Sequence, residues 1–338
     1  MRRFTNGMDA PRVDSELRRL AEQALTHWGL DGARIEPVSI RENVTFRVDK
    51  GGQAYVLRIH RSWYHTLDEL NSELKWTAAL REAGLDVPEA LLTSDGRGYV
   101  TVTLPGSGET RNIGLLKWVE GELLSEVIAR ESDEASLCRH FEQLGRLAAR
   151  IHNQSSAWQP PPGFRRHSLD VDGLVGESPF WGPFWDLPQF EPHQRHVISE
   201  ARRVIQDVLT AYGKSPDTYS LIHADLNPQN LVVGERGLHV IDFDDSGFGW
   251  HQYELAVALR YYREHPHYQA IEDALIEGYR AERPLPDAAL ALLPVFLLAR
   301  RLAQLGWIRQ RPELGLDERL PKLIEEACVR AEALLDCW

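Results

Sequence analysis

The first 120 residues carry apolar positions at strand spacing, interrupted by two stretches at helical spacing. Residues 37–48 and 54–60 are rich in β-branched side chains, and Asp49-Lys50-Gly51-Gly52 lies between them. A polar pair followed by two glycines is typical of a hairpin turn, so the pattern predicts two antiparallel strands here. Helical spacing predicts helices over 12–30 and 67–83, and further strands are expected at about 98–104 and 113–119.

The pattern changes after Gly121, because most of the remaining chain has apolar residues at helical spacing. Residues 155–191, rich in Pro, Gly and Trp, show no clear period, and short apolar runs within 219–242 predict a small β island. The longest apolar run, 288–299, contains Pro294 and is too short to span a bilayer, which favours a buried helix. Helices are predicted over 134–153, 192–212, 251–264, 267–282, 287–309 and 317–336.

These elements predict an α+β protein with two lobes. A small β-rich N-terminal lobe would cover residues 1–116, a hinge linker 117–121, and a larger, mainly helical C-terminal lobe 122–338 with the β island and the acceptor site. The length of 338 residues suits two lobes, and a cleft between lobes is a common place for a small-molecule site.

Charge and cysteine content narrow the expected partners. The chain has 38 Lys and Arg against 50 Asp and Glu, a net charge of −12, and it lacks the basic stripe typical of nucleic-acid binders. We therefore expect a small-molecule partner, and neither nucleic acid nor a membrane. The three cysteines have no metal-ligand spacing, and the first 20 residues lack the apolar core of a signal peptide, so a cytoplasmic location is expected.

The stretch YSLIHADLNPQNLVVGERGLHVIDFDD (219–245) places polar residues at the ends of short strands. Asn230 follows Asp225 by five residues, and Asp242 ends the second strand of a hairpin, so the three can meet at one edge of the β island. Asp225 could accept the proton of an attacking hydroxyl, while Asn230 and Asp242 offer oxygen ligands suited to Mg²⁺. Turn stabilisation would explain any one of them alone, but the combination predicts phosphoryl transfer.

Two motifs, HADLNPQN (223–230) and IDFDDSGFG (241–249), resemble the catalytic core of the aminoglycoside phosphotransferase and choline kinase superfamily. Within it, the chain most resembles the branch of type II homoserine kinase and the bacterial stress-response kinases, over roughly residues 35–310. The resemblance implies a protein-kinase-like fold, ATP and Mg²⁺ as cofactors, and phosphate transfer to a hydroxyl. Weaker support comes from YVLRIHR (55–61), LLKWVEG (115–121) and LGRLAARIH (144–152).

The resemblance also implies roles for individual residues. Asp225 would be the catalytic base, and Asn230 and Asp242 the metal ligands. His223 and Glu254 would support the catalytic loop, with Glu254 standing where the superfamily more often has aspartate. The nucleotide would be bound in the N-terminal lobe by Arg58 with its ion-pair partner Glu73, by Asn43 and Thr45 over the phosphates, and by the backbone of Lys117 and Val119 at the adenine.

The acceptor end of the site is less specified by the sequence. Trp181 and Trp185 either belong to the core or line an acceptor pocket, and Asp244 is either a further ligand or solvated. The concentration of acidic residues predicts a field that favours a small hydroxyl compound carrying an amine. Arg300 and Arg301 are expected to form structural ion pairs, with contact to an anionic acceptor as the alternative.

The sequence thus predicts an ATP-dependent small-molecule kinase. One alternative is a Ser/Thr protein kinase of the stress-response type, although the chain has no activation segment ending in Ala-Pro-Glu. The other is a catalytically idle nucleotide-binding protein, which the complete set of Asp225, Asn230 and Asp242 argues against.

Overall fold

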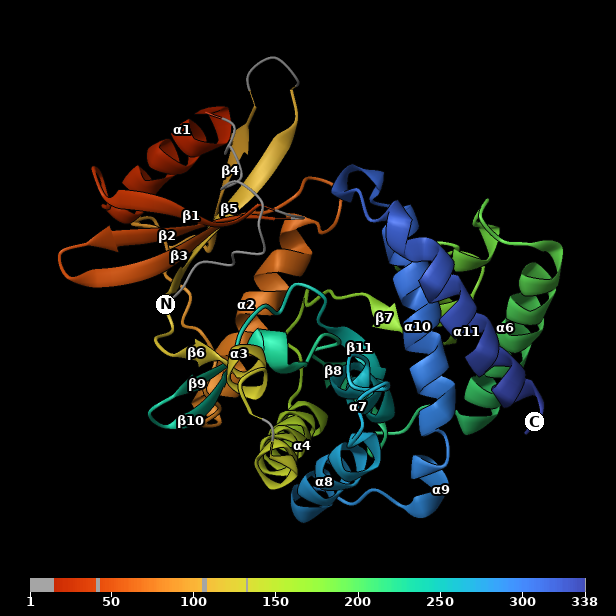
Figure 1. Ribbon diagram of the computed structural model, residues 1–338. Helices are drawn as coiled ribbons and strands as arrows, with labels where there is room; N and C mark the ends of the chain where they lie inside the picture. Colours follow the sequence, from red (N-terminus) through yellow and green to blue (C-terminus); the bar gives the residue numbers. More distant parts are fainter. Residues whose placement is uncertain (1–14, 41–42, 105–107, 132, 338) are drawn as a thin grey trace. The chain divides into compact units, whose positions relative to one another are not determined.

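The structure is a computed structural model that describes residues 15–40, 43–104, 108–131 and 133–337 (Figure 1). It is a mixed α+β protein with a β-rich N-terminal sheet and a helical C-terminal region, as predicted. The chain forms two compact units: an N-terminal unit (1–123, 160–165 and 232–241) and a C-terminal unit (124–159, 166–231 and 242–338). Two segments that follow the predicted linker in the sequence, 160–165 and 232–241, belong to the N-terminal unit.

The N-terminal unit is built on a five-stranded antiparallel sheet in the order β1-β2-β3-β5-β4. The single strand predicted over 37–48 is instead two strands, β1 and β2, whose pairing is irregular between Pro37 and Ser39. The predicted turn is confirmed, since Gly51 and Gly52 join β2 to β3 with φ values of 61° and 78°. The strands are β1 (Arg34–Ile40), β2 (Val44–Lys50), β3 (Gln53–Ile59), β4 (Tyr99–Thr103) and β5 (Thr110–Lys117).

Alternation along the strands gives this sheet two different faces. Phe46 and Leu57 are fully buried in an apolar cluster with α1 (Ser15–Ala24) and the short helix η1 (Leu25–Trp28), and α1 lies across the sheet in Figure 1. Thr45 and Arg58 pair directly across β2 and β3 and, because side chains alternate along a strand, they point to the opposite face. The predicted nucleotide-binding side chains of the sheet therefore lie on the face away from its core.

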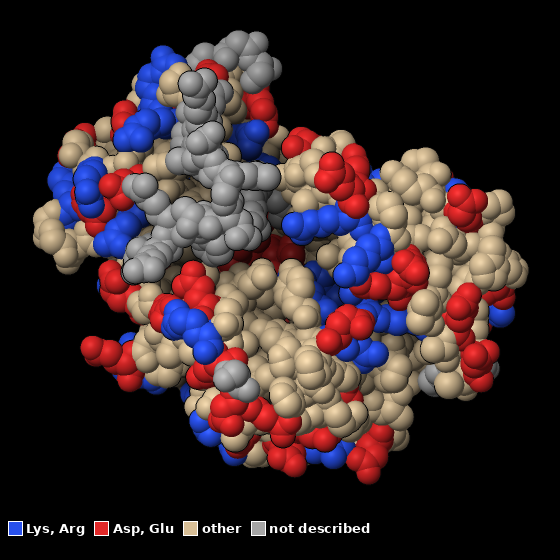
Figure 2. Space-filling model, in the orientation of Figure 1, with Lys and Arg blue, Asp and Glu red and all other residues tan. Residues whose placement is uncertain are grey.

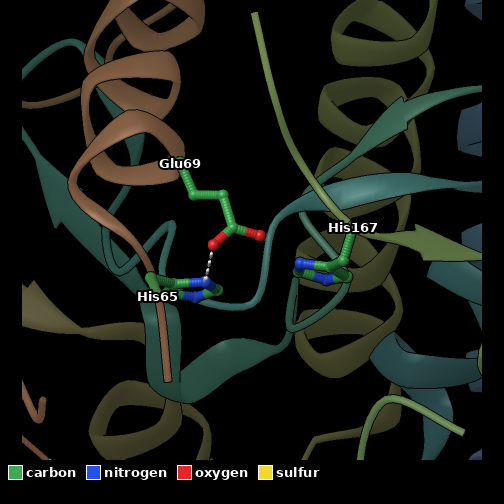
Figure 3. Close-up of side chains that lie close together, drawn as sticks. All are labelled: His65, Glu69 and His167. Atoms are coloured by element: carbon green, nitrogen blue, oxygen red, sulfur yellow. Dashed lines mark ion pairs between the residues drawn. The ribbon is translucent and has the colours of Figure 1, made fainter. Parts of the chain in front are cut away.

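Helix α2 (Leu67–Glu82) begins with a capping box that fixes its first turn. The backbone N–H of Thr66 donates to the Glu69 carboxylate at 2.8 Å, and the N–H of Glu69 donates back to the Thr66 hydroxyl at 3.3 Å. The same carboxylate pairs with the buried His65 ring at 4.0 Å (Figure 3). This start sets the position of Glu73 one turn further along α2.

The predicted single β island is wrong, because its strands belong to two sheets. Strands β9 (Leu231–Gly234) and β10 (Gly237–Val240) pair with β6 (Glu122–Leu123), whereas β8 (Tyr219–Ile222) pairs with the unpredicted β11 (Gly247–Trp250), which also pairs with β7 (Ser168–Leu169). Glycines make β11 possible: a Cβ at Gly249 would lie 2.5 Å from the Ile222 side chain. Two glycines among four residues also hide the strand from pattern analysis.

The C-terminal unit is mainly helical, and its centre is α7 (His251–Leu259), of which every residue is buried. α10 (Leu293–Arg309) packs against α7 and α11 (Leu320–Leu335), and α11 also packs along α6 (Pro192–Tyr212), as Figure 1 shows. By length and composition Asp287–Arg309 could cross a membrane, but 61% of its apolar window is buried, as predicted for a core helix. The other helices are α3 (Leu124–Ile128), α4 (Glu134–Ala157), α5 (Val171–Val175), α8 (Tyr268–Glu282) and α9 (Asp287–Leu290).

Candidate active site

The two predicted catalytic motifs share an unusual backbone conformation. Among the described residues, Ala224 and Asp242 are the only non-glycine residues with positive φ, at 63° and 65°. A left-handed conformation costs a non-glycine residue of order 1–3 kcal/mol, and such strain collects at functional sites. Ala224 stands directly before Asp225, so both strained residues lie within the motifs that the sequence singled out.

Asp225 is held at both carboxylate oxygens within the C-terminal unit. Its Oδ1 lies 2.7 Å from Arg260 Nη1, and its Oδ2 accepts a hydrogen bond from Asn230 Nδ2 at 2.6 Å. The same Asn230 nitrogen donates to the Asp225 carbonyl at 2.9 Å. The spacing of five residues therefore does bring Asp225 and Asn230 into contact, and the carboxylate is fixed rather than free to rotate.

The bonds of Asn230 also bear on the predicted metal site. Because its amide nitrogen is turned to Asp225, its amide oxygen faces away and can serve as a ligand. Asn230 directly precedes β9, and Asp242 follows β10 by two residues, so both stand at the open end of the β9–β10 hairpin. Asp242 is exposed, and an amide oxygen with a carboxylate is a donor set that fits a hard divalent cation.

Glu254, in α7, accepts hydrogen bonds from the backbone of the catalytic loop (223–230). Its carboxylate is fully buried and accepts the backbone N–H of His223 at 2.6 Å, with further bonds from the N–H groups of Ala224 and Leu226. The His223 ring in turn accepts the N–H of Asp225 at 3.2 Å. Burial raises the pKa of Glu254 to about 7, although the neighbouring His223 ring and the backbone donors oppose that rise.

Two side chains that sequence analysis missed also shape the site. The fully buried Asn227 donates to the Asp225 carbonyl at 2.8 Å and accepts the Gln229 N–H at 3.0 Å. Arg166, from the stretch without clear period, donates to the carbonyls of Ser246 at 2.6 Å and Asp244 at 2.7 Å. The segment 155–191 thus helps to hold the loop after Asp242. An asparagine before a proline was a visible turn signal, whereas no local spacing pointed to Arg166.

The two tryptophans predicted for the acceptor side, Trp181 and Trp185, have different neighbours. Trp181 is 2% exposed and stacks on Tyr253, with ring centres 6.3 Å apart. Trp185 instead lies under Arg202 of α6, whose guanidinium carbon is 3.6 Å from the ring centre. Trp185 also contacts the neighbouring Phe184 ring, with ring centres 5.0 Å apart. Asp244 is 7% exposed, so the alternative that it is merely solvated is wrong.

The arginines of the C-terminal unit change the expected electrostatics. Arg301 forms the expected structural pair, with Glu326 at 2.9 Å, but Arg300 Nη2 lies 3.6 Å from Asp225 Oδ1. Although burial opposes its charge, the Asp225 carboxylate holds the pKa of Arg260 above its ordinary value. Arg260 and Arg300 thus offset the charge of Asp225, and the contact of Arg300 is not the structural ion pair that was expected for it.

In the N-terminal unit, Arg58 and Glu73 line one small pocket. Glu73 is 6% exposed, and the pocket wall includes Tyr99 and Gly114. A Cβ at Gly114 would lie 2.6 Å from the Tyr99 ring, so the glycine lets that ring close the pocket. The structure thus places the predicted phosphate-binding arginine and its predicted acidic partner at one cavity.

Two of the remaining residues predicted to bind the nucleotide already form hydrogen bonds within the protein. The Lys117 N–H donates to the Glu89 carbonyl at 2.8 Å, which removes it as a donor to adenine and leaves Val119 for that proposed role. Asn43 Oδ1 accepts the N–H of Arg61 at 3.2 Å, so its side chain orders the loop after β3. Thr45 lies opposite Arg58, where its hydroxyl points to the same face of the sheet.

Arg58→Met is expected to raise the KM for ATP about tenfold or more, with little change in melting temperature. The substitution keeps the stem that packs along the strand and removes a guanidinium that would make charge-assisted bonds to phosphate, each contributing roughly 1.5–3 kcal/mol. Steady-state kinetics with varied ATP would measure the effect. Arg18, which lies on α1 at the core face of the sheet and pairs with Glu22 at 3.3 Å, supplies the control Arg18→Met. Equal ATP KM values in both variants would make Arg58 an ordinary strand residue.

This fold and site define a phosphotransferase. Residues 34–289 match the model of the phosphotransferase enzyme family, and the chain belongs to that family. The protein is accordingly a kinase of the aminoglycoside phosphotransferase type, and the family resemblance of its two motifs is confirmed.

Individual relatives act on small molecules. The chain is 33% identical to a microcompartment-associated aminopropanol kinase of known structure, covering 93% of this chain and 94% of that one with a TM-score of 0.78. It is 23% identical to the amicoumacin kinase of Bacillus subtilis over 91% of this chain and 89% of the relative. It is 26% identical to the homoserine kinase of Rhizobium etli over 75% and 73% of the two chains.

Proposed function

We propose that the protein transfers the γ-phosphate of ATP to a hydroxyl of a small, amine-bearing molecule. The observation that carries the proposal is the fixed Asp225 carboxylate, bonded to Asn230 and Arg260 in a strained loop. The names of the relatives support the acceptor class, because aminopropanol and homoserine both carry a hydroxyl and an amine. The aminopropanol kinase, the amicoumacin kinase and the homoserine kinase all transfer phosphate to a small molecule.

The residues of the C-terminal unit can position the acceptor and hold its proton. Asn230 and Arg260 bind opposite oxygens of Asp225, so the carboxylate keeps one orientation toward an incoming hydroxyl. Each oxygen retains a lone pair, and Asp225 can therefore orient the hydroxyl and receive its proton as the bond to phosphorus forms. Mg²⁺, held by the Asn230 amide oxygen and Asp242, would neutralise phosphate charge when bound.

An assay of ADP release tests the proposal directly. The protein would be incubated with ATP and Mg²⁺ and a panel of amino alcohols, hydroxy amino acids, aminoglycosides, neutral sugars and hydroxy acids, beside a generic protein substrate. We expect acceptor-dependent ADP release with one or more amine-bearing alcohols. Phosphorylation of the protein substrate alone would overturn the small-molecule function. ADP release that does not depend on any acceptor would be ATP hydrolysis and would overturn the proposed transfer to these compounds.

Asp242→Ala should weaken the dependence of ATP binding on Mg²⁺ more than Asn230→Ala does. Asp242 would contribute a full negative charge to the cation, whereas Asn230 contributes a neutral dipole. Titration of ATP binding at a series of Mg²⁺ concentrations would show the midpoint of the metal dependence rising by about tenfold or more in Asp242→Ala. An unchanged midpoint would remove Asp242 from the metal site.

A further inference from the structure

Arg300 is a buried cation whose contacts do not account for its position. Its side chain reaches from α10 to Asp225, and the residue is 9% exposed. The Nη2–Oδ1 distance of 3.6 Å is longer than a hydrogen bond, and Nε is buried without a hydrogen-bond partner among the described residues. Arg260 already pairs with the same oxygen at 2.7 Å, so Asp225 has a counter-charge without Arg300.

The next residue, Arg301, shows which partners the chain provides for an arginine with a structural role. Arg301 pairs with Glu326 at 2.9 Å and donates to Gln304 at 3.0 Å. A guanidinium that is taken out of water without such partners costs folding free energy. The contrast between two consecutive arginines indicates that Arg300 is placed for a partner outside the chain.

The surroundings of Arg300 contain a second unsatisfied donor and a flat wall. Its guanidinium carbon lies 5.6 Å from the centre of the Trp181 ring, and Trp181 stacks on Tyr253. The Tyr253 hydroxyl is fully buried and has no hydrogen-bond partner in the described part of the chain. Burial, and then the negative charge of Asp245, raise the pKa of this phenol, so it remains a donor and Asp245 lies within electrostatic range.

We propose that Arg300 binds a carboxylate of the acceptor, which makes the acceptor a short hydroxy amino acid rather than a simple amino alcohol. The inference rests on the proposed function and specifies its substrate class. A guanidinium matches a carboxylate with two parallel hydrogen bonds. Because Arg300 reaches to within 3.6 Å of Asp225, the carboxylate and the reacting hydroxyl must be only a few atoms apart.

Acceptors that differ only by the carboxylate test this assignment on the unaltered protein. The pairs are L-homoserine and 3-aminopropan-1-ol, L-serine and 2-aminoethanol, and L-threonine and 1-aminopropan-2-ol. The kcat/KM of each would be measured by ADP release at saturating ATP. Charge-assisted bonds predict a preference of about 10- to 100-fold for the carboxylate-bearing member of at least one pair, expressed mainly in KM.

Variants at the two adjacent arginines identify the group responsible. Arg300→Met should raise the KM for the preferred hydroxy amino acid at least tenfold and reduce the preference to near unity, without changing the ATP KM. Arg300→Lys should recover part of the preference. Arg301→Met, the matched control on the same helix, should keep it. Melting temperatures would be recorded for all three variants.

The results distinguish a failure of the carboxylate site from a failure of the proposed function. A wild-type preference for the amino alcohol in every active pair would overturn the carboxylate site and leave the proposed function intact, and it would do so without any variant. A preference for the hydroxy amino acid that persists in a folded Arg300→Met protein would also overturn the role of Arg300. Absence of phosphorylation of all six compounds, together with failure of the wider panel, would instead count against the proposed function.

Discussion

Asp225→Asn is expected to lower kcat by about 100- to 10,000-fold, the range that a positioned general base contributes, while the KM for ATP stays within about twofold. The substitution preserves the shape of the side chain and removes the proton acceptor. The predicted nucleotide contacts lie in the N-terminal unit, so ATP binding should be little affected. Steady-state kinetics with varied ATP, using the acceptor found in the panel, would measure both quantities. Near-normal turnover would show that Asp225 is not the base.

The contact with Arg260 requires a control for stability. Asp225→Asn leaves Arg260 without its counter-charge, and removing one partner of a buried pair can destabilise a protein by about 3–5 kcal/mol. Both side chains retain some exposure, so a smaller loss is expected here. The double variant Asp225→Asn/Arg260→Gln should regain melting temperature but not activity. Recovery of turnover in the double variant would mean that the single variant fails through misfolding rather than through loss of the base.

Local sequence signals predicted the framework of the site well. The Gly51-Gly52 turn is legible because two consecutive positive φ angles demand glycine, and the helices follow from apolar spacing. Asp225 and Asn230 were expected to meet through hairpin geometry within one β island. They do meet, although β8 and β9 lie in different sheets, because the Asn230 amide folds back onto Asp225. The left-handed conformations of Ala224 and Asp242 were not predictable, because alanine disfavours positive φ and because aspartate, although enriched there, adopts it at only a small share of its positions.

The site residues that the sequence did not predict are those brought there by packing between distant segments of the chain. Arg260, directly after α7, and Arg300, in α10, reach Asp225, and Arg166 reaches the loop after Asp242 from a stretch with no period. No spacing in the sequence relates these arginines to the carboxylate, so a count of charges over the acidic motif alone left out the two cations beside Asp225. Whether Trp181 and Trp185 belong to the core or line an acceptor pocket could not be decided from spacing for the same reason, because Arg300 and Arg202, which contact them, come from distant helices.

Glu254→Ala is expected to lower the melting temperature by about 10 °C. The substitution removes the acceptor for backbone N–H groups of the catalytic loop, among them that of His223 at 2.6 Å. Each buried donor left without a partner costs roughly 1–3 kcal/mol, and in a chain of this size 1 kcal/mol shifts the midpoint by about 2–4 °C. Thermal unfolding would measure the loss. A change of less than about 2 °C would show that the loop does not depend on this brace.

Glu254→Gln should separate the charge of this residue from its acceptor role, because glutamine retains one carbonyl oxygen. The pKa of Glu254 is about 7 in the folded protein against an ordinary value of 4.5, so the folded state binds the proton more tightly. The resulting stabilisation is complete below pH 4.5 and is lost as the pH rises through about 7. The buried His152 and His251 act in the opposite direction, since burial lowers the pKa of each ring and unfolding takes up protons. Both histidines are present in both proteins, but His152 Nε2 lies 3.7 Å from Glu254 Oε2, so the difference in melting temperature between Glu254→Gln and wild type reports Glu254 together with its effect on His152. That difference should move in favour of the variant between pH 5 and pH 8, and a difference independent of pH would mean that Glu254 stays ionised throughout this range.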